Sequence, residues 1–180
     1  MIRGLTSICL TNHGDIDDAS RLEQLSPTGL SIITGVEISS TVGDFIIFSD
    51  DRAFLRSLMP EQQLPERAAR PKNTAVVWAH PFAGNPGGLN ANADYIKDMA
   101  SRVDGIEVYN GRWPDTLAAS LAQEIAGEYS LAELGGSDAH QVGQLMLCWT
   151  AIAGEITSTA ELVEAIRGGN TTACRIHESA

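Results

Sequence analysis

Positive charge is scarce in this sequence of 180 residues. Lys and Arg together number 12 against 23 Asp and Glu, which gives a formal net charge of -11. Proteins that hold nucleic-acid phosphates or anionic membranes need a basic surface, so the composition argues against both kinds of partner. We therefore expect neither duplex nucleic acid nor a membrane among the binding partners. An acidic chain is compatible with a protein that gathers carboxylates around metal ions.

Long apolar runs and cysteine pairs are also missing. No stretch approaches the ~20 apolar residues needed to cross a bilayer, and the segment after Met1 has no secretory cleavage pattern. The three cysteines are far apart in sequence, which excludes a CxxC pair and a disulfide framework. These absences favour a cytoplasmic protein with reduced thiols. Because 43% of the residues are hydrophobic, we expect one folded domain over residues 1–180.

Several catalytic signatures are absent as well. The sequence has no HExxH motif, no phosphate-binding loop ending in Gly-Lys-Ser/Thr, no GxGxxG and no Gly-x-Ser-x-Gly elbow. A serine hydrolase of the elbow type is therefore not expected. Lys72 and Lys97 are the only lysines, and neither is near a candidate metal ligand, which argues against a carbamylated-lysine site.

What the chain does contain is an alternation of strand-like and helix-like segments. Strands are predicted over 5–11, 31–38 with a break at Gly35, 45–48, 74–79, 105–109, 147–153 and 171–176. Helices are predicted over 92–103, 116–128 and 158–167, the last with a capping box of Ser158 and Glu161. Strands separated by helices imply an α/β fold with a parallel sheet or barrel.

The placement of histidine is the most informative feature. His13, His80 and His140 each follow an apolar or strand-like run, whereas the fourth histidine, His177, is in the polar tail. In parallel α/β barrels, residues at one end of the strands converge on the active site. Glu37 lies inside an apolar strand, where a carboxylate has to be paired or coordinated.

These residue types together favour a site for a divalent first-row metal. Asp138 and His140 are two residues apart, so in extended backbone they point to the same side. Imidazoles and carboxylates are the ligands such metals take. Each residue alone has a plainer interpretation: a hydrogen-bonded histidine, or an aspartate that caps a helix. Three histidines at strand ends make the metal site the preferred interpretation.

Two further residues are candidates for binding substrate. Arg112 follows the strand that contains Glu107 and Asn110, and its planar guanidinium suits a substrate phosphate. A solvated arginine is the alternative. We expect Asn110 and Arg112 to contact the substrate.

Five segments of the sequence resemble the PHP family, the polymerase and histidinol phosphatase domain. The segments are Leu10-Thr11-Asn12-His13, Gly35-Val36-Glu37-Ile38, Ala79-His80-Pro81, Ile106-Glu107-Val108-Tyr109-Asn110 and Gly136-Ser137-Asp138-Ala139-His140. Their order and spacing match the family, and the segment from Glu161 to Gly169 resembles its last helix. The resemblance implies a distorted seven-stranded (β/α)7 TIM-like barrel that binds up to three divalent ions, of Zn, Mn, Mg or Fe.

The resemblance also implies a role for each matched residue. Glu37 bridges two metals, His80 binds the second and Asp138 the first, while His13 and His140 bind the third. Asp138 and His140 are in addition the expected catalytic residues that move protons. Family members are metal-dependent phosphoesterases that act on monoesters, and some are nucleases.

Two differences from the family pattern stand out. The family's first strand ends in a His-x-His pair that this sequence lacks, and Asn12 occupies a position that is usually Asp. We therefore expect a barrel that is incomplete at its N-terminus.

The expected function is hydrolysis of a phosphoester in a small phosphorylated substrate by a metal-activated water. The first alternative is a degenerate, non-catalytic PHP-like domain that binds a metal or a phosphorylated ligand. The second is metal-dependent cleavage of a C–N or C–O bond. The sequence leaves the oligomeric state open.

Overall fold

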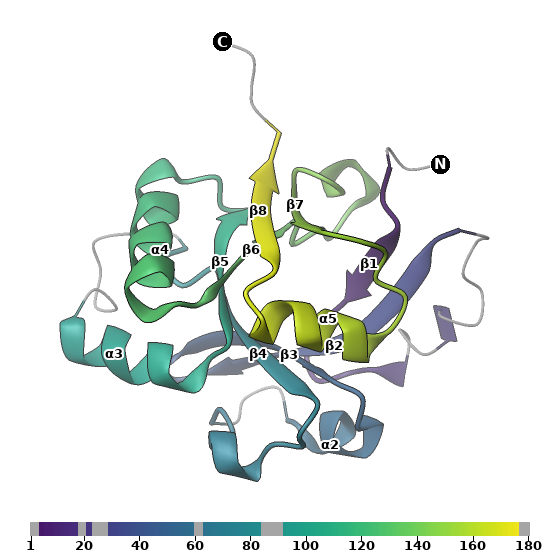
Figure 1. Ribbon diagram of the computed structural model, residues 1–180, viewed down its shortest axis with the longest axis horizontal. Helices are drawn as coiled ribbons and strands as arrows, with labels where there is room; N and C mark the ends of the chain where they lie inside the picture. The colour runs from purple at the N-terminus through teal and green to yellow at the C-terminus, as the bar shows by residue number, and fades with distance from the viewer. Residues whose placement is uncertain (1–3, 18–20, 23–28, 60–62, 84–91, 177–180) are drawn as a thin grey trace.

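A curled, six-stranded sheet forms the centre of the computed structural model of the protein (Figure 1). The structure describes residues 4–17, 21–22, 29–59, 63–83 and 92–176. The strands lie side by side in their chain order: β1 (Ser7–Leu10), β2 (Ser31–Ser40), β3 (Gly43–Ser49), β4 (Thr74–Ala79), β5 (Gly105–Asn110) and β6 (Ala132–Gly136). A second sheet, made of β7 (Cys148–Ile152) and β8 (Thr171–Arg175), packs beside β6.

Four α-helices have both ends within the described residues: α2 (Arg52–Ser57), α3 (Ala93–Arg102), α4 (Thr116–Tyr129) and α5 (Thr159–Arg167). Each begins after a side chain that accepts a hydrogen bond from the first turn, and these caps are Asp51, Asn92, Asp115 and Ser158. The three predicted helices and the capping box of Ser158 and Glu161 are confirmed. Helix α2 was not predicted, because six residues are too few to show a helical period.

All seven predicted strands are also present, with one difference at Gly35. Strand β2 continues through this residue instead of breaking there. Gly35 pairs across the sheet with Phe48, and a Cβ at Gly35 would lie 2.7 Å from the Phe48 ring. The glycine therefore makes room for an aromatic side chain inside a regular strand. Strand β6 contains the end of the apolar run before Gly135 as well as Gly135 itself, and it was not among the predicted strands.

The expectation of a parallel sheet is wrong at β3. Strands β1 and β2 pair in parallel, as do β4 with β5 and β5 with β6, but β3 is antiparallel to both of its neighbours. Only Thr41 and Val42 separate the paired ends of β2 and β3, at Ser40 and Gly43. A parallel crossover needs a dozen or more residues, so a link this short forces the chain to turn straight back. Strands β7 and β8 also pair antiparallel, along their whole length.

The sheet is covered on both faces by apolar side chains. On one face, Val76 and Trp78 of β4 pack with residues from α2, α3 and α4, including Leu55, Met99 and Ile125. On the other face, Ala75 and Val77 pack with Leu162, Val163 and Ile166 of α5. Because both faces are covered, all six residues of β4 are buried, which explains why this segment is the strongest apolar run in the sequence.

The architecture is thus the mixed α/β, barrel-like type predicted, in the form of a curled half-barrel. Six strands belong to the curled sheet and two form a separate pair, which differs from seven regular β/α units. Among the described residues, no helix has the length and apolar character needed to cross a membrane.

The cap of α5 gives a test of this local structure. Replacing Ser158 by Ala removes the side chain that accepts from the Glu161 main-chain N–H, and we expect the free energy of unfolding to fall by ~1 kcal/mol. Urea denaturation at unchanged slope measures the effect. Ser120→Ala in the interior of α4 is the control, because its hydroxyl bonds only the Thr116 carbonyl, and we expect it to change stability by less than ~0.5 kcal/mol. Equal effects of the two substitutions would contradict the role of the cap.

Candidate metal centre

One cavity of about 680 Å³ collects most of the predicted site residues at one end of the curled sheet. The predicted residues that line it are His13, Glu37, His80, Asn110, Asp138 and His140. They come from within β2, from the end of β5 and from the segments that follow β1, β4 and β6, so residues more than a hundred positions apart meet here. Arg112 lies beside the cavity through its contact with His140.

His80 is at the centre of this arrangement. It follows the buried strand β4, and its Nε2 lies 3.3 Å from Glu37 Oε1 while its Nδ1 lies 3.8 Å from Asp44 Oδ2. Its own main-chain N–H donates to Glu107 Oε2 at 2.9 Å. The backbone of His80 has φ of 26°, a conformation that non-glycine residues seldom adopt. The end of β4 is therefore turned so that side chain and main chain both meet carboxylates.

The charged groups around His80 change the pKa of its imidazole. Burial by itself lowers the pKa of His80. The hydrogen bond to Glu37 and the charges of the nearby carboxylates outweigh it and raise the pKa to about 9. The negative charge of the carboxylates around the His80 imidazole thus stabilises its protonated form.

Asp44 was missed by the sequence analysis. It sits at the start of β3, and because β3 runs antiparallel to β4, Asp44 pairs with Ala79, the residue just before His80. In a parallel sheet the ligands are expected toward the C-terminal ends of strands, and Asp44 lies at the beginning of its strand. In a reversed strand the beginning lies at the site, and the short link between β2 and β3 was the signal that could have revealed it.

Glu107 is the second carboxylate that the sequence analysis did not assign to the metal site. Its side chain is buried, and Oε2 accepts from the His80 main chain and from Asn110 Nδ2 at 3.0 Å. Burial raises the pKa of Glu107, although the hydrogen bond from Asn110 and the charge of His80 act in the other direction. A Cβ on Gly136 would collide with Oε1, so this position of β6 has to be glycine while Glu107 stays in place.

His13 approaches the other oxygen of Glu37. Its Nε2 lies 3.7 Å from Glu37 Oε2, and its side chain is 54% exposed. Main-chain bonds hold it there: the Glu37 N–H donates to the Asn12 carbonyl, and the Gly14 N–H donates to the Glu37 carbonyl. His13 and Glu37 form an isolated parallel bridge that continues the pairing of β1 with β2. Glu37 thereby has an imidazole at each oxygen.

Asp138 and His140 follow β6 and turn toward each other. His140 Nδ1 lies 3.1 Å from the Asp138 carbonyl oxygen and 3.5 Å from Asp138 Oδ1. His140 Nε2 lies 3.3 Å from Arg112 Nη1, which can only donate. The two contacts together favour the tautomer with the proton on Nδ1 and the lone pair on Nε2. Asp138 is close enough to Glu107 for its charge to raise the pKa of that group.

Asn110 links the carboxylates to the loop after β5. Its Nδ2 donates to Glu107, and its Oδ1 accepts from the main-chain N–H groups of Arg112 and Trp113 at 2.9 and 3.2 Å. The Arg112 guanidinium lies over the Trp113 ring at 5.7 Å. The buried amide therefore orients the loop that carries Arg112. Substrate contact by Asn110 and Arg112 stays a prediction.

The donor set fits a divalent cation. Glu37, Asp44 and His80 each place one ligand atom within 4.8 Å of the others. The ion pairs of Glu37 that the structure gives are with His13 and His80, so this carboxylate is balanced by imidazoles. Mixed imidazole nitrogen and carboxylate oxygen suit zinc, manganese or iron. His177 lies outside the described residues.

Comparison with known proteins gives one family match. Residues 117–171 match the family model described as PHP-associated. No curated protein matches the sequence. The matched residues 117–171 include nearly all of α4, together with β6, the Asp138–His140 segment and α5.

Two solved structures share the fold. The first is PsfC from Pseudomonas syringae PB-5123, with a TM-score of 0.71 and 18% identity, over 97% of this chain and 79% of that one. The second is named a putative metal-dependent phosphoesterase from Bifidobacterium adolescentis, with a TM-score of 0.53 and 13% identity, over 90% of this chain and 86% of that one. The PHP-associated match is confined to residues 117–171, and the similarity to the two solved structures extends over nearly the whole chain as a similarity in fold.

Proposed function

We propose that this protein hydrolyses a phosphoester of a small phosphorylated substrate, using divalent metal ions bound in the cavity. The observation that carries the proposal is the convergence of Glu37 and His80 with Asp44 as a supporting carboxylate: one nitrogen or oxygen atom of each lies within 4.8 Å of the others. A similar fold occurs in a protein named as a putative metal-dependent phosphoesterase, which supports the same chemistry here. We further propose that the curled sheet is an open form of a (β/α)7 barrel.

The ligand set proposed is the one expected from the sequence, and Asp44 and Glu107 are added to it as supporting carboxylates. Glu37 and His80 form its centre, with His13, Asp138 and His140 around them, and up to three ions are proposed. A divalent ion in this site supplies Lewis acidity, which screens the charge of a phosphate and activates a water as nucleophile. Glu107 is buried and already accepts two hydrogen bonds, so we assign it to orienting His80 and Asn110.

Asp44 is proposed to position His80. Its Oδ2 faces His80 Nδ1, while His80 Nε2 faces Glu37. An imidazole that binds a metal through one nitrogen commonly donates its other N–H to a carboxylate, which fixes the ring and strengthens it as a ligand. Asp44 fits this second role, from the reversed strand β3.

The residues that move protons and hold the substrate come from the other side of the cavity. His140 keeps its Nδ1 against Asp138, so its Nε2 is free to take a ligand or a proton once Arg112 swings away. Arg112 is held by Asn110 through its main chain only, and its guanidinium is at the surface, where it can pair with a phosphate. The proposed catalytic residues are Asp138 and His140, as expected from the sequence.

The first test removes ligands. We expect His80→Ala and Asp138→Asn each to lower metal-dependent phosphatase turnover by at least ~100-fold while the far-UV circular dichroism spectrum is retained. Assays with p-nitrophenyl phosphate and Mn²⁺ or Zn²⁺ measure the change. Glu124→Gln, at an exposed carboxylate on α4, is the matched control and should keep full turnover. Turnover like that of the wild type in either site variant would contradict the proposal.

The second test addresses Asp44. If it orients His80, Asp44→Ala should weaken metal binding by about 10–100-fold, and Asp44→Asn should restore part of the affinity. Titration with a competing chelator measures affinity, and elemental analysis measures the number of ions. We expect the number at saturation to stay the same in both variants. Loss of one whole ion would instead make Asp44 a direct ligand, and an unchanged affinity would remove it from the site.

The third test uses the proton held by His80. Because its pKa is raised to about 9 in the metal-free protein, a metal that binds this imidazole at pH 7.5 has to displace a proton. Calorimetry in buffers of different ionisation enthalpy should show release of about one proton from this group. The affinity should rise with pH until about 9 and then level off. His80→Gln should abolish that release, and equal release from the variant would contradict the assignment.

A further inference from the structure

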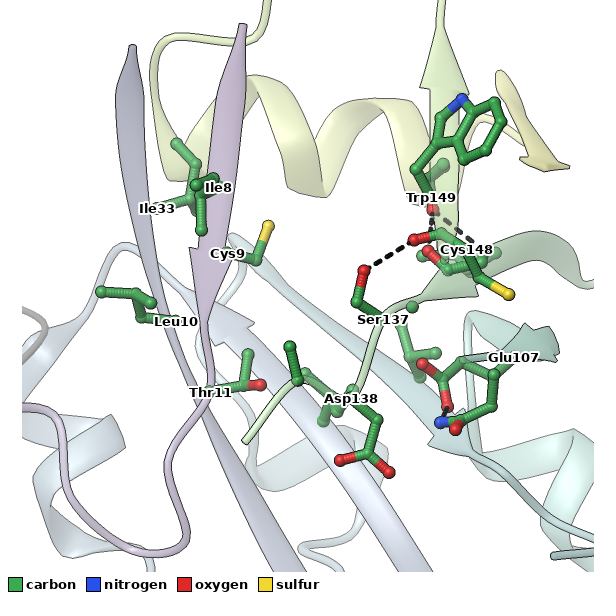
Figure 2. A pocket seen from close by; sticks show the side chains of 18 of the residues that line it. Ile8, Cys9, Leu10, Thr11, Ile33, Glu107, Ser137, Asp138, Cys148 and Trp149 are labelled. Carbon is green, nitrogen blue, oxygen red and sulfur yellow. Dashed lines mark hydrogen bonds between the residues drawn. The ribbon is translucent and has the colours of Figure 1, made fainter. Parts of the chain in front are cut away.

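The cavity does not stop at the metal centre. It continues between β1 and the segment from Ser137 to Trp149, toward α5 (Figure 2). In this view Glu107 and Asp138 lie at one end, whereas Ile8 and Ile33 lie farther along the wall. We call this second part the shaft. Five apolar residues of one buried cluster line the cavity as a whole: Ile33, Phe48, Val77, Leu134 and Leu162.

Cys9 lies on the wall of the shaft, at a position that solvent reaches. By surface area this residue of β1 is exposed, yet burial raises the pKa of its thiol to about 12. A side chain on the wall of an open cavity is reached by solvent on one side while protein atoms surround it on the others. Figure 2 shows the Cys9 side chain on the side of β1 where Ser137 and Cys148 lie.

The wall opposite β1 has little hydrogen-bonding capacity left for a ligand. The Thr150 hydroxyl accepts from the Gly135 N–H and donates to the Gly135 carbonyl, at 3.0 Å each. The Ser137 hydroxyl donates to the Cys148 carbonyl and accepts from the Met146 N–H, at 2.9 Å each. A polar occupant would lose hydrogen bonds with water on this side and find few replacements. An apolar occupant loses none.

From this continuity we propose that the substrate is a phosphate ester of an apolar alcohol, with the phosphate at the metal centre and the alkyl or aryl group in the shaft. The inference rests on the proposed function for its charged end and on the shaft for its apolar end. The cavity, at about 680 Å³, is in the range of pockets that take small organic ligands. Strand β1 has four residues, so its wall runs for about 10 Å.

The experiment measures binding of alkylphosphonates, which carry the same head group and are not hydrolysed. Isothermal titration of the Mn²⁺-loaded protein with methyl-, butyl-, hexyl- and octylphosphonate gives an affinity for each chain length. We expect affinity to rise by up to about fourfold per methylene and to level off when the chain fills the shaft. Equal affinity for methyl- and octylphosphonate would overturn the inference.

A filled shaft gives the matched variant. Cys9→Phe adds a ring that points into the space, and we expect the ratio of octyl to methyl affinity to fall to near one. Cys9→Met fills less of the space and should lower the ratio in part. It is the second variant, for use if the larger Phe side chain impairs folding. Thr172→Phe adds the same ring at an exposed position of β8 and should keep the wild-type ratio. A ratio unaffected by both Cys9 variants would also overturn the inference.

The remaining outcomes separate this inference from the proposed function. If affinity grows with chain length but no alkyl phosphate is hydrolysed, the apolar site stands and the phosphoesterase activity fails. If alkyl phosphates are hydrolysed at rates independent of chain length, the activity stands and the apolar site fails. If the protein is a dimer in solution and Cys9→Phe dissociates it, a second polypeptide occupies the shaft, and this would overturn the inference.

Discussion

The structure depends on a single electrostatic constraint, the meeting of several carboxylates around one imidazole. Glu37, Asp44 and Glu107 come from three different strands and all face His80, by side chain or by main chain. Like charges at such distances repel, and burial of Glu107 adds to the cost. A protonated His80 relieves part of this in the metal-free protein, and a divalent cation would relieve more. The sheet supplies the packing that keeps the carboxylates together.

That packing explains why the site is where it is. Strand β4 is buried on both faces, so the chain that leads to His80 has little freedom to move. The strand beside it, β3, is reversed by a short link, and this reversal delivers Asp44 to the same end as His80. Glycine then permits the last close approach, at Gly136 against Glu107. Apolar burial, chain reversal and the absence of a side chain thus each place one part of the site.

Much of this could be predicted from local patterns. Helical spacing and caps identify α3, α4 and α5, and β-branched runs identify most of the strands, because these signals act over a few residues. The histidines at strand ends line one cavity as expected. Asp44 was missed because its contribution depends on strand direction, and strand direction depends on which segments pair. Gly35 was misread for a similar reason, since its role is set by Phe48 on the neighbouring strand.

The sequence by itself determined the kinds of ligand, their order along the chain, the acidic balance and the apolar segments that form the core, because each of these is a property of residues and of their near neighbours. The tertiary structure decided which carboxylate meets which nitrogen and that β3 turns back. It also decided that an apolar shaft opens beside the metal centre. Distances between groups that are far apart in sequence arise only when the sheet curls, and the chemistry of the site follows from those distances.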